Sequence, residues 1–423
     1  MSDSGTTMQK AVVLWISGLP FADISAVAEV ETLAAQGFKV ELIPSLITGL
    51  QSQYFQVLGG KAPATFGFFD TLMPAHQLAR PANGTSGYRI EEDLSGRDSA
   101  PRFFTDLLRN AGWTVELVET SPREALEKMR ALPDNSPQPA CKIIKIRLDR
   151  QTLTTNDVVS IAETLRLARV WMGASGLLAL LCDAQFAEVK RFVNINNFLA
   201  EMGIIERDEQ SGSIDWSNSL AYFAGHGQLW INLLGRDPQG AVHPQDEYAE
   251  VRDSLIKAIP DKLRDSKTGE KVVERVYRKE EIYAGDYLFC APDLVVQFMP
   301  GYAPSQNSAH LGFDEHIFTD PLAEATTMAG MHPQQIRGYL LATAPSLAVN
   351  PSIYEPVPLT SVAPTLLHAL GIEYAGMDSA AVEALFSPAY LETHPILMNN
   401  KSQELSDEDE ELVIGRLRDL GYI

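Results

Sequence analysis

The 423-residue sequence has little cysteine and no long apolar run. Its three cysteines, Cys141, Cys182 and Cys290, are too few and too widely spaced for a disulfide framework or a paired-cysteine metal site. No window reaches about 18 consecutive apolar residues, so we expect no membrane-spanning helix and no membrane partner. Residues 1–10 lack the apolar core of a secretory signal peptide. These absences predict a cytoplasmic protein.

Basic residues are also outnumbered. The 34 Lys and Arg residues stand against 55 Asp and Glu residues, which gives a net charge of −21. A surface of this sign repels phosphate backbones, so we expect no nucleic acid partner. Hydrophobic residues make up 45% of the chain, enough to bury a sizeable core. The length is typical of two or three domains, or of one large α/β domain with an insertion.

Short apolar runs alternate with stretches of helical character. The runs lie at residues 11–16, 39–43, 113–118, 142–148, 177–182, 294–298 and 338–343. Strands that are apolar throughout and separated by helices predict an α/β fold, with a mostly parallel central sheet and helices on both faces.

The chain between the runs suggests how the domains are organised. Residues 189–285 contain alternating strand-like pieces, many turns and an amphipathic helix, which predict a smaller inserted subdomain. The core is then formed by residues 1–188 and 286–395. Residues 396–423 predict a tail with a docking helix, because Ser406 and Asp409 form a capping-box pattern ahead of an apolar stripe. The turn at residues 235–240, GRDPQG, is interpreted as structural.

Several segments, taken in chain order, carry a family resemblance. They are VVLWISGL, LGGKAPATFGFFD, LALLCDAQFAEVKRFVNINNFLAEMGII, LAYFAGHGQLWINLLGRDPQGAV, APDLVV, GMHPQQIRGYLLATAP and VAPTLLHALGI. Together they resemble the alkaline phosphatase superfamily, in particular its type I phosphodiesterase/nucleotide pyrophosphatase and phosphohydrolase/phosphomutase-like branch. The resemblance covers most of the chain and implies an alkaline-phosphatase-like sandwich.

The resemblance also implies a set of site positions. In that family two divalent metals, usually zinc, activate a Thr or Ser nucleophile and clamp the transferring phosphoryl group. The matching positions here are Ser17 for the first Asp, Leu50 for the nucleophile, Asp149 and Leu153 for an Asp-x-x-x-His pair, Asp183 and Ala184 for an Asp-His pair, and His332 for a late His. Thr48, two residues before Leu50, is a nearby nucleophile candidate.

Most of these positions have lost the side chain that the chemistry needs. Ser17, Leu153 and Ala184 are lost-ligand positions, and Asp149, Asp183 and His332 are the vestigial metal candidates. A catalytic zinc ion usually has three protein ligands, and neither remnant reaches that number.

The surviving candidates also have structural interpretations. A lone histidine such as His332 is more often a hydrogen-bonded structural residue than a ligand. Because an isolated buried carboxylate is costly, Asp183 is expected to face solvent, cap a turn or pair with a cation. Lys61 and Arg337 are expected to be solvated surface charges.

The sequence therefore leaves three hypotheses about function. The first is a pseudoenzyme with no cofactor that binds or regulates an unknown protein or small-molecule ligand, as a homo- or hetero-oligomer. The second is a zinc- or other metal-dependent phosphohydrolase or phosphodiesterase with a rearranged site built from Thr48, Asp149, Asp183 and His332. The third is a metal-independent activity that uses Ser17 or Thr48 with His332.

Overall fold

The computed structural model describes residues 8–46, 50–66, 69, 72–74, 88, 90–92, 103–132, 139–148, 153–322, 325–327, 331–351, 353 and 355–396. Of the positions named above, Thr48, Asp149 and the predicted tail helix lie outside these residues. Within them, no helix is both long enough and apolar enough to cross a membrane.

A seven-stranded sheet organises the larger part of the molecule. Its order is β20-β2-β19-β7-β1-β6-β5. The strands are β1 (Lys10–Ile16), β2 (Phe38–Ile43), β5 (Thr114–Thr120), β6 (Ala140–Ile146), β7 (Leu177–Ala184), β19 (Arg337–Thr343) and β20 (Val357–Pro358). Only β19 runs antiparallel to its neighbours β2 and β7, so the sheet is mostly parallel, as predicted.

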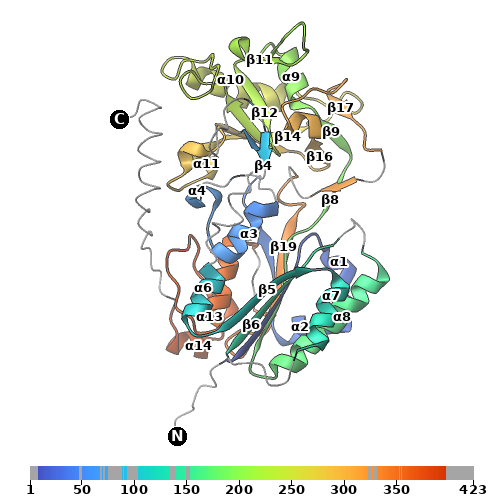
Figure 1. Ribbon diagram of the computed structural model, residues 1–423, viewed down its shortest axis with the longest axis vertical. Coiled ribbons are helices and arrows are strands. Elements are labelled where there is room, and N and C mark those ends of the chain that lie inside the picture. Colours follow the sequence, from blue (N-terminus) through green and yellow to red (C-terminus); the bar gives the residue numbers. More distant parts are fainter. Residues whose placement is uncertain are drawn as a thin grey trace.

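Helices cover both faces of this sheet (Figure 1). One face packs against α3 (Leu50–Gly59), α6 (Phe103–Asn110) and α13 (Val362–Ala369), with α14 (Pro388–Thr393) beside them. The other face packs against α1 (Phe21–Ile24), α2 (Ala28–Gln36), α7 (Pro122–Arg130) and α8 (Thr155–Met172). Alternate residues of β1 point to the two faces, and both sets are buried. This double burial explains why the strands are apolar throughout.

A four-stranded antiparallel sheet forms the core of the second part. Its order is β12-β13-β15-β14, with β12 (Ala221–Ala224), β13 (Gln228–Ile231), β14 (Val273–Arg278) and β15 (Leu294–Phe298). The helices α9 (Ile195–Glu201) and α10 (Tyr248–Lys262) pack against it. Figure 1 shows this part in the upper half of the view, above α3 and β19.

The position of β15 corrects one expectation. Residues 294–298 were predicted to belong with the parallel strands, but they pair antiparallel with β13 and β14. All five side chains of β15 are buried, so its sequence lacks the polar face that usually marks an antiparallel strand. The small sheet thus extends past residue 285, where the inserted subdomain was predicted to end. The other domain boundaries stay predictions.

The remaining elements are short. The small strand pairs and triplets are β3 (Leu72–Pro74) with β4 (Ile90–Glu92), β8 (Ala187–Val189) with β18 (Ala325–Thr327), β10 (Glu206–Arg207) with β11 (Ile214–Asp215), and β9 (Arg191–Val193) between β16 (Tyr302–Pro304) and β17 (Phe318–Thr319). The remaining helices are α4 (Pro63–Phe66), α11 (Lys279–Ile282) and α12 (Gln306–Ala309), with short 3-10 turns at Trp216–Asn218, Leu288–Cys290, Leu359–Ser361 and Glu383–Leu385.

Candidate functional site

Four side chains meet at the carboxyl ends of β1, β6 and β7. Trp15 of β1 pairs in register with Lys145 of β6 on one side and with Leu181 of β7 on the other. Asp183 lies two residues beyond Leu181, so it points to the same face of the sheet as Trp15 and Lys145. Ser17 directly follows β1 and bonds to Asp183. We call Trp15, Ser17, Lys145 and Asp183 the strand-end cluster.

Asp183 is the centre of this cluster. Its side chain is buried, with 1% of the residue exposed. Its Oδ1 accepts a hydrogen bond of 3.0 Å from the backbone N–H of Ala184. Burial raises the pKa of Asp183, while the positive charge of Lys145 and the hydroxyl group of Ser17 offset part of that rise. Burial thus disfavours the carboxylate, and these neighbouring groups partly compensate.

Of the three surroundings expected for Asp183, solvent is excluded by its burial, and the positive charge of Lys145 acts on its carboxylate. The sequence analysis did not single out Lys145 as a site residue, because a single lysine in an apolar strand is normally exposed to solvent. A signal was present in CKIIKI, where Lys145 has the same parity as the buried residues Cys141 and Ile143. Two-residue periodicity alone would have turned the Lys145 side chain towards the covered face.

The ends of β1 and β7 are held together beside the cluster. Gly18 has a φ of 80° and donates its backbone N–H to the carbonyl oxygen of Ala184 at 2.8 Å. A Cβ atom on Gly18 would lie 2.2 Å from the ring of Phe186. Glycine is therefore required at this turn by both its backbone conformation and the space available.

His332 forms its hydrogen bonds with residues outside the strand-end cluster. Its residue is 6% exposed, and its Nε2 lies 2.5 Å from Oε2 of Glu274 on β14. The other ring nitrogen, Nδ1, accepts a hydrogen bond of 3.1 Å from the backbone N–H of Gln334. Both nitrogens are thus occupied, and the described residues contain no hydrogen bond between His332 and Asp183.

The remaining predicted positions are spread over the larger sheet. Leu50 is the first residue of α3, the helix that packs over the Trp15 face. Leu153 is partly buried on the opposite face, against the cluster that contains α7 and α8. The Nη1 of Arg337 is 2.8 Å from Oε2 of Glu41.

Lys61 departs from the expectation of a solvated surface charge. The residue is 8% exposed. Burial lowers its pKa, while the negative charges of Asp378 and Asp286 oppose that change. The apolar residues of α3 just before it gave no sign of this burial, because the covering residues are far away in the sequence.

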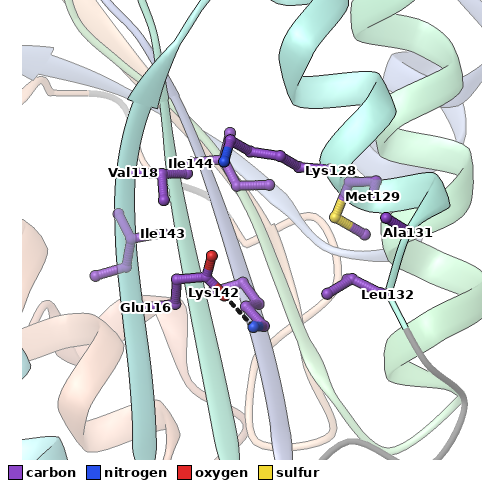
Figure 2. A pocket seen from close by; sticks show the side chains of 9 residues that line it. All are labelled: Glu116, Val118, Lys128, Met129, Ala131, Leu132, Lys142, Ile143 and Ile144. Atoms are coloured by element: carbon purple, nitrogen blue, oxygen red, sulfur yellow. Dashed lines mark hydrogen bonds and ion pairs between the residues drawn. The ribbon is translucent and has the colours of Figure 1, made fainter.

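A pocket of about 600 Å³, open solvent included, lies on the other face of the larger sheet. Figure 2 shows Met129 and Leu132 on one side of it, facing side chains of β5 and β6. Glu116 is the carboxylate in its lining and is paired with Lys142. This pocket contains none of the candidates predicted from the sequence.

The described residues contain no group of three or more His, Cys, Asp or Glu side chains close enough to hold a metal ion, and the metal candidate Asp149 lies outside them. Within the strand-end cluster, Asp183 is the residue that has a carboxylate to offer a metal ion. The side chain of the neighbouring Ala184 has no atom that can coordinate a metal. Lys145 adds a positive charge, which would repel a divalent cation.

Comparison with known proteins shows similarity in fold. No known family profile matches the sequence, and no curated protein matches it. A solved structure that does match is that of murine ectonucleotide pyrophosphatase/phosphodiesterase 5, an inactive Thr-to-Ala variant in complex with AMP. The TM-score is 0.55 at 13% identity, and the match covers 90% of this chain and 100% of that one. This likeness confirms the predicted fold class.

Proposed function

We propose that this chain is a binding protein with a phosphodiesterase-like fold and without two-metal phosphoryl transfer. The observation that carries the proposal is the environment of Asp183. This carboxylate is buried among Trp15, Ser17 and Lys145. Its Oδ1 accepts a hydrogen bond from the backbone N–H of Ala184.

The chemistry of phosphoryl transfer supports this proposal. The transferring group carries negative charge on several oxygens, and catalysis depends on concentrated positive charge and an activated nucleophile. In the strand-end cluster the positive charge is the single ammonium group of Lys145, which lies 4.9 Å from the centroid of the Trp15 ring. Ser17 has a hydroxyl group, but neither Ser17 nor Asp183 supplies the concentrated positive charge that phosphoryl transfer needs.

A small-molecule or protein ligand is the proposed occupant of this fold. AMP is a suitable first probe, because the murine protein of similar fold was solved in complex with it. Binding of AMP to the full chain is measured by isothermal titration calorimetry, with adenosine as the matched compound that lacks the phosphate.

The decisive experiment is a hydrolysis assay on the full chain. A nitrophenyl phosphodiester is offered with added zinc or manganese and again after chelation, while elemental analysis measures the metal that copurifies. We expect no turnover above buffer and far less than one metal ion per chain. Turnover that disappears with the chelator and in Asp183→Ala would overturn the proposal and favour the metal-dependent hydrolase.

A further inference from the structure

We propose that the pocket between α7 and the strands β5 and β6 binds a small carboxylate with a short apolar chain, and that Lys128 holds the carboxylate group. The inference goes beyond the proposed function, because this pocket and the strand-end cluster lie on opposite faces of the larger sheet. It rests on three features of the pocket, which are a partly uncovered sheet edge, an apolar wall and a cation in the lining.

The first feature is the incomplete cover of the sheet at β5. This strand is the last one in the sheet order, with β6 as its neighbour. α7 packs against β6, and α8 packs against β1 and β7, so these helices cover the inner strands. Several side chains of β5 are therefore exposed or only partly buried, and the hollow beside it measures about 600 Å³ with open solvent included. Small-molecule sites occupy roughly 300–1,000 Å³.

The second feature is the apolar wall of the pocket. Met129 and Ile144 are buried, whereas Val118 and Leu132 are partly buried and pack against the same apolar cluster. All four residues line the pocket. A hydrocarbon chain placed against Val118 and Leu132 removes apolar surface of both the chain and the protein from water, which favours binding.

The third feature is the ammonium group of Lys128. Figure 2 shows this side chain reaching from α7 across the pocket towards the strands. It forms no hydrogen bond and no ion pair with the residues that the structure describes. Glu116 has another partner, Lys142, and Glu124 completes the capping box of α7 with Ser121. Lys128 is therefore the lining cation that is available to an anionic ligand.

The charge of this cation selects the head group of the ligand. One ammonium group compensates one negative charge and donates up to three hydrogen bonds. A carboxylate meets this condition, whereas a phosphate dianion would keep excess negative charge beside a protein whose net charge is −21. The pair of Glu116 and Lys142 adds no net charge to the pocket.

The test is a titration of the full chain with octanoate, followed by NMR of protein with ¹³C-labelled methionine methyl groups. The Met129 signal, identified by its loss in Met129→Leu, should shift on binding because Met129 lines the pocket. Lys128→Gln should weaken binding by about tenfold, the loss expected for one hydrogen bond between charged groups. Lys128 is exposed, so this variant should fold like the native chain.

Two matched compounds separate the contributions of the chain and the charge. 1-Octanol keeps the apolar chain without the charge, and acetate keeps the charge without the chain, so both should bind far more weakly than octanoate. Lys262→Gln, at the exposed end of α10, is the control variant and should bind octanoate like the native chain. An unshifted Met129 signal, equal affinity in Lys128→Gln, or equal binding of octanol or acetate would overturn the proposal.

Discussion

At the scale of single residues, the small-sheet part of the molecule holds a pair of opposite charges whose side chains are almost completely buried. Asp293 is 0% exposed and accepts two hydrogen bonds of 2.8 Å from Arg236. It also accepts 2.7 Å from the Tyr248 hydroxyl and 2.8 Å from the Ile231 backbone N–H. Arg236 belongs to the turn at residues 235–240, and its contacts agree with the structural role predicted for that turn.

Asp293→Asn should destabilise the protein by about 3–5 kcal/mol, because it leaves the buried Arg236 guanidinium without its main counter-charge. The measurement is the urea unfolding midpoint at neutral pH. Asp253→Asn is the control, since Asp253 pairs with Arg278 on the surface, and it should change the midpoint little. Equal effects of the two substitutions would contradict this account.

The same carboxylate predicts a pH dependence. Burial on its own would raise the pKa of Asp293, but Arg236, Lys279 and the backbone N–H of Ile231 together outweigh it and lower the pKa from 3.8 to about 2. A folded-state pKa below the unfolded value gives stability that is present above pH 3.8 and is lost as the pH falls towards about 2. The stability difference between the native chain and Asp293→Asn should therefore narrow across this range. The prediction would be contradicted if the unfolding midpoints of the native chain and Asp293→Asn differed by a constant amount down to a pH of about 2.

At the scale of elements, β19 is the strand that departs from the parallel order. It lies between β2 and β7 and pairs antiparallel with both. Gly338 makes this close approach possible, because a Cβ at this position would lie 2.1 Å from the carbonyl oxygen of Cys182 and 2.6 Å from that of Asp183. Both carbonyl oxygens belong to β7, beside the strand-end cluster.

Gly338→Ala should lower stability by about 1–3 kcal/mol, because the added methyl group must push β19 away from β7. The loss is measured by thermal and urea unfolding. Gly312→Ala is a milder comparison, since the nearest atom to its added Cβ is the Asn307 carbonyl oxygen at 3.1 Å. If Gly338→Ala is tolerated as well as Gly312→Ala, the packing of β19 is looser than the structure implies.

The elements also separate what the sequence predicts from what it leaves open. The apolar runs at residues 11–16 and 177–182 lie within β1 and β7, and their burial on both faces predicted a parallel sheet. The run at 294–298 is equally apolar but belongs to an antiparallel sheet, so burial alone does not decide which strands pair. That Lys145 and Asp183 share one face of the sheet could not be predicted for a similar reason, because the register between β6, β1 and β7 is set between strands distant in sequence.

At the scale of the whole molecule, His332 links the two sheets. It lies in the segment before β19 of the larger sheet, and its Nε2 bonds Glu274 on β14 of the small sheet at 2.5 Å. Glu274 is also bonded by the side chain of Gln297 on β15. A residue expected from the resemblance to be a vestigial metal ligand thus contacts the small sheet in the structure.

If this link is the main role of His332, His332→Ala should destabilise the protein by about 1–2 kcal/mol without changing its metal content, because it removes a hydrogen bond to a carboxylate. Glu274→Ala should act through the same contact, so the double variant should lose less than the sum of the two single variants. Amide hydrogen exchange should rise in β14 and in residues 331–336 in either variant. Glu281→Ala is the control, because Glu281 pairs with Arg275 on the surface and its effect should simply add to that of His332→Ala. Additivity between His332→Ala and Glu274→Ala, or a fall in bound metal, would show that His332 acts through other groups.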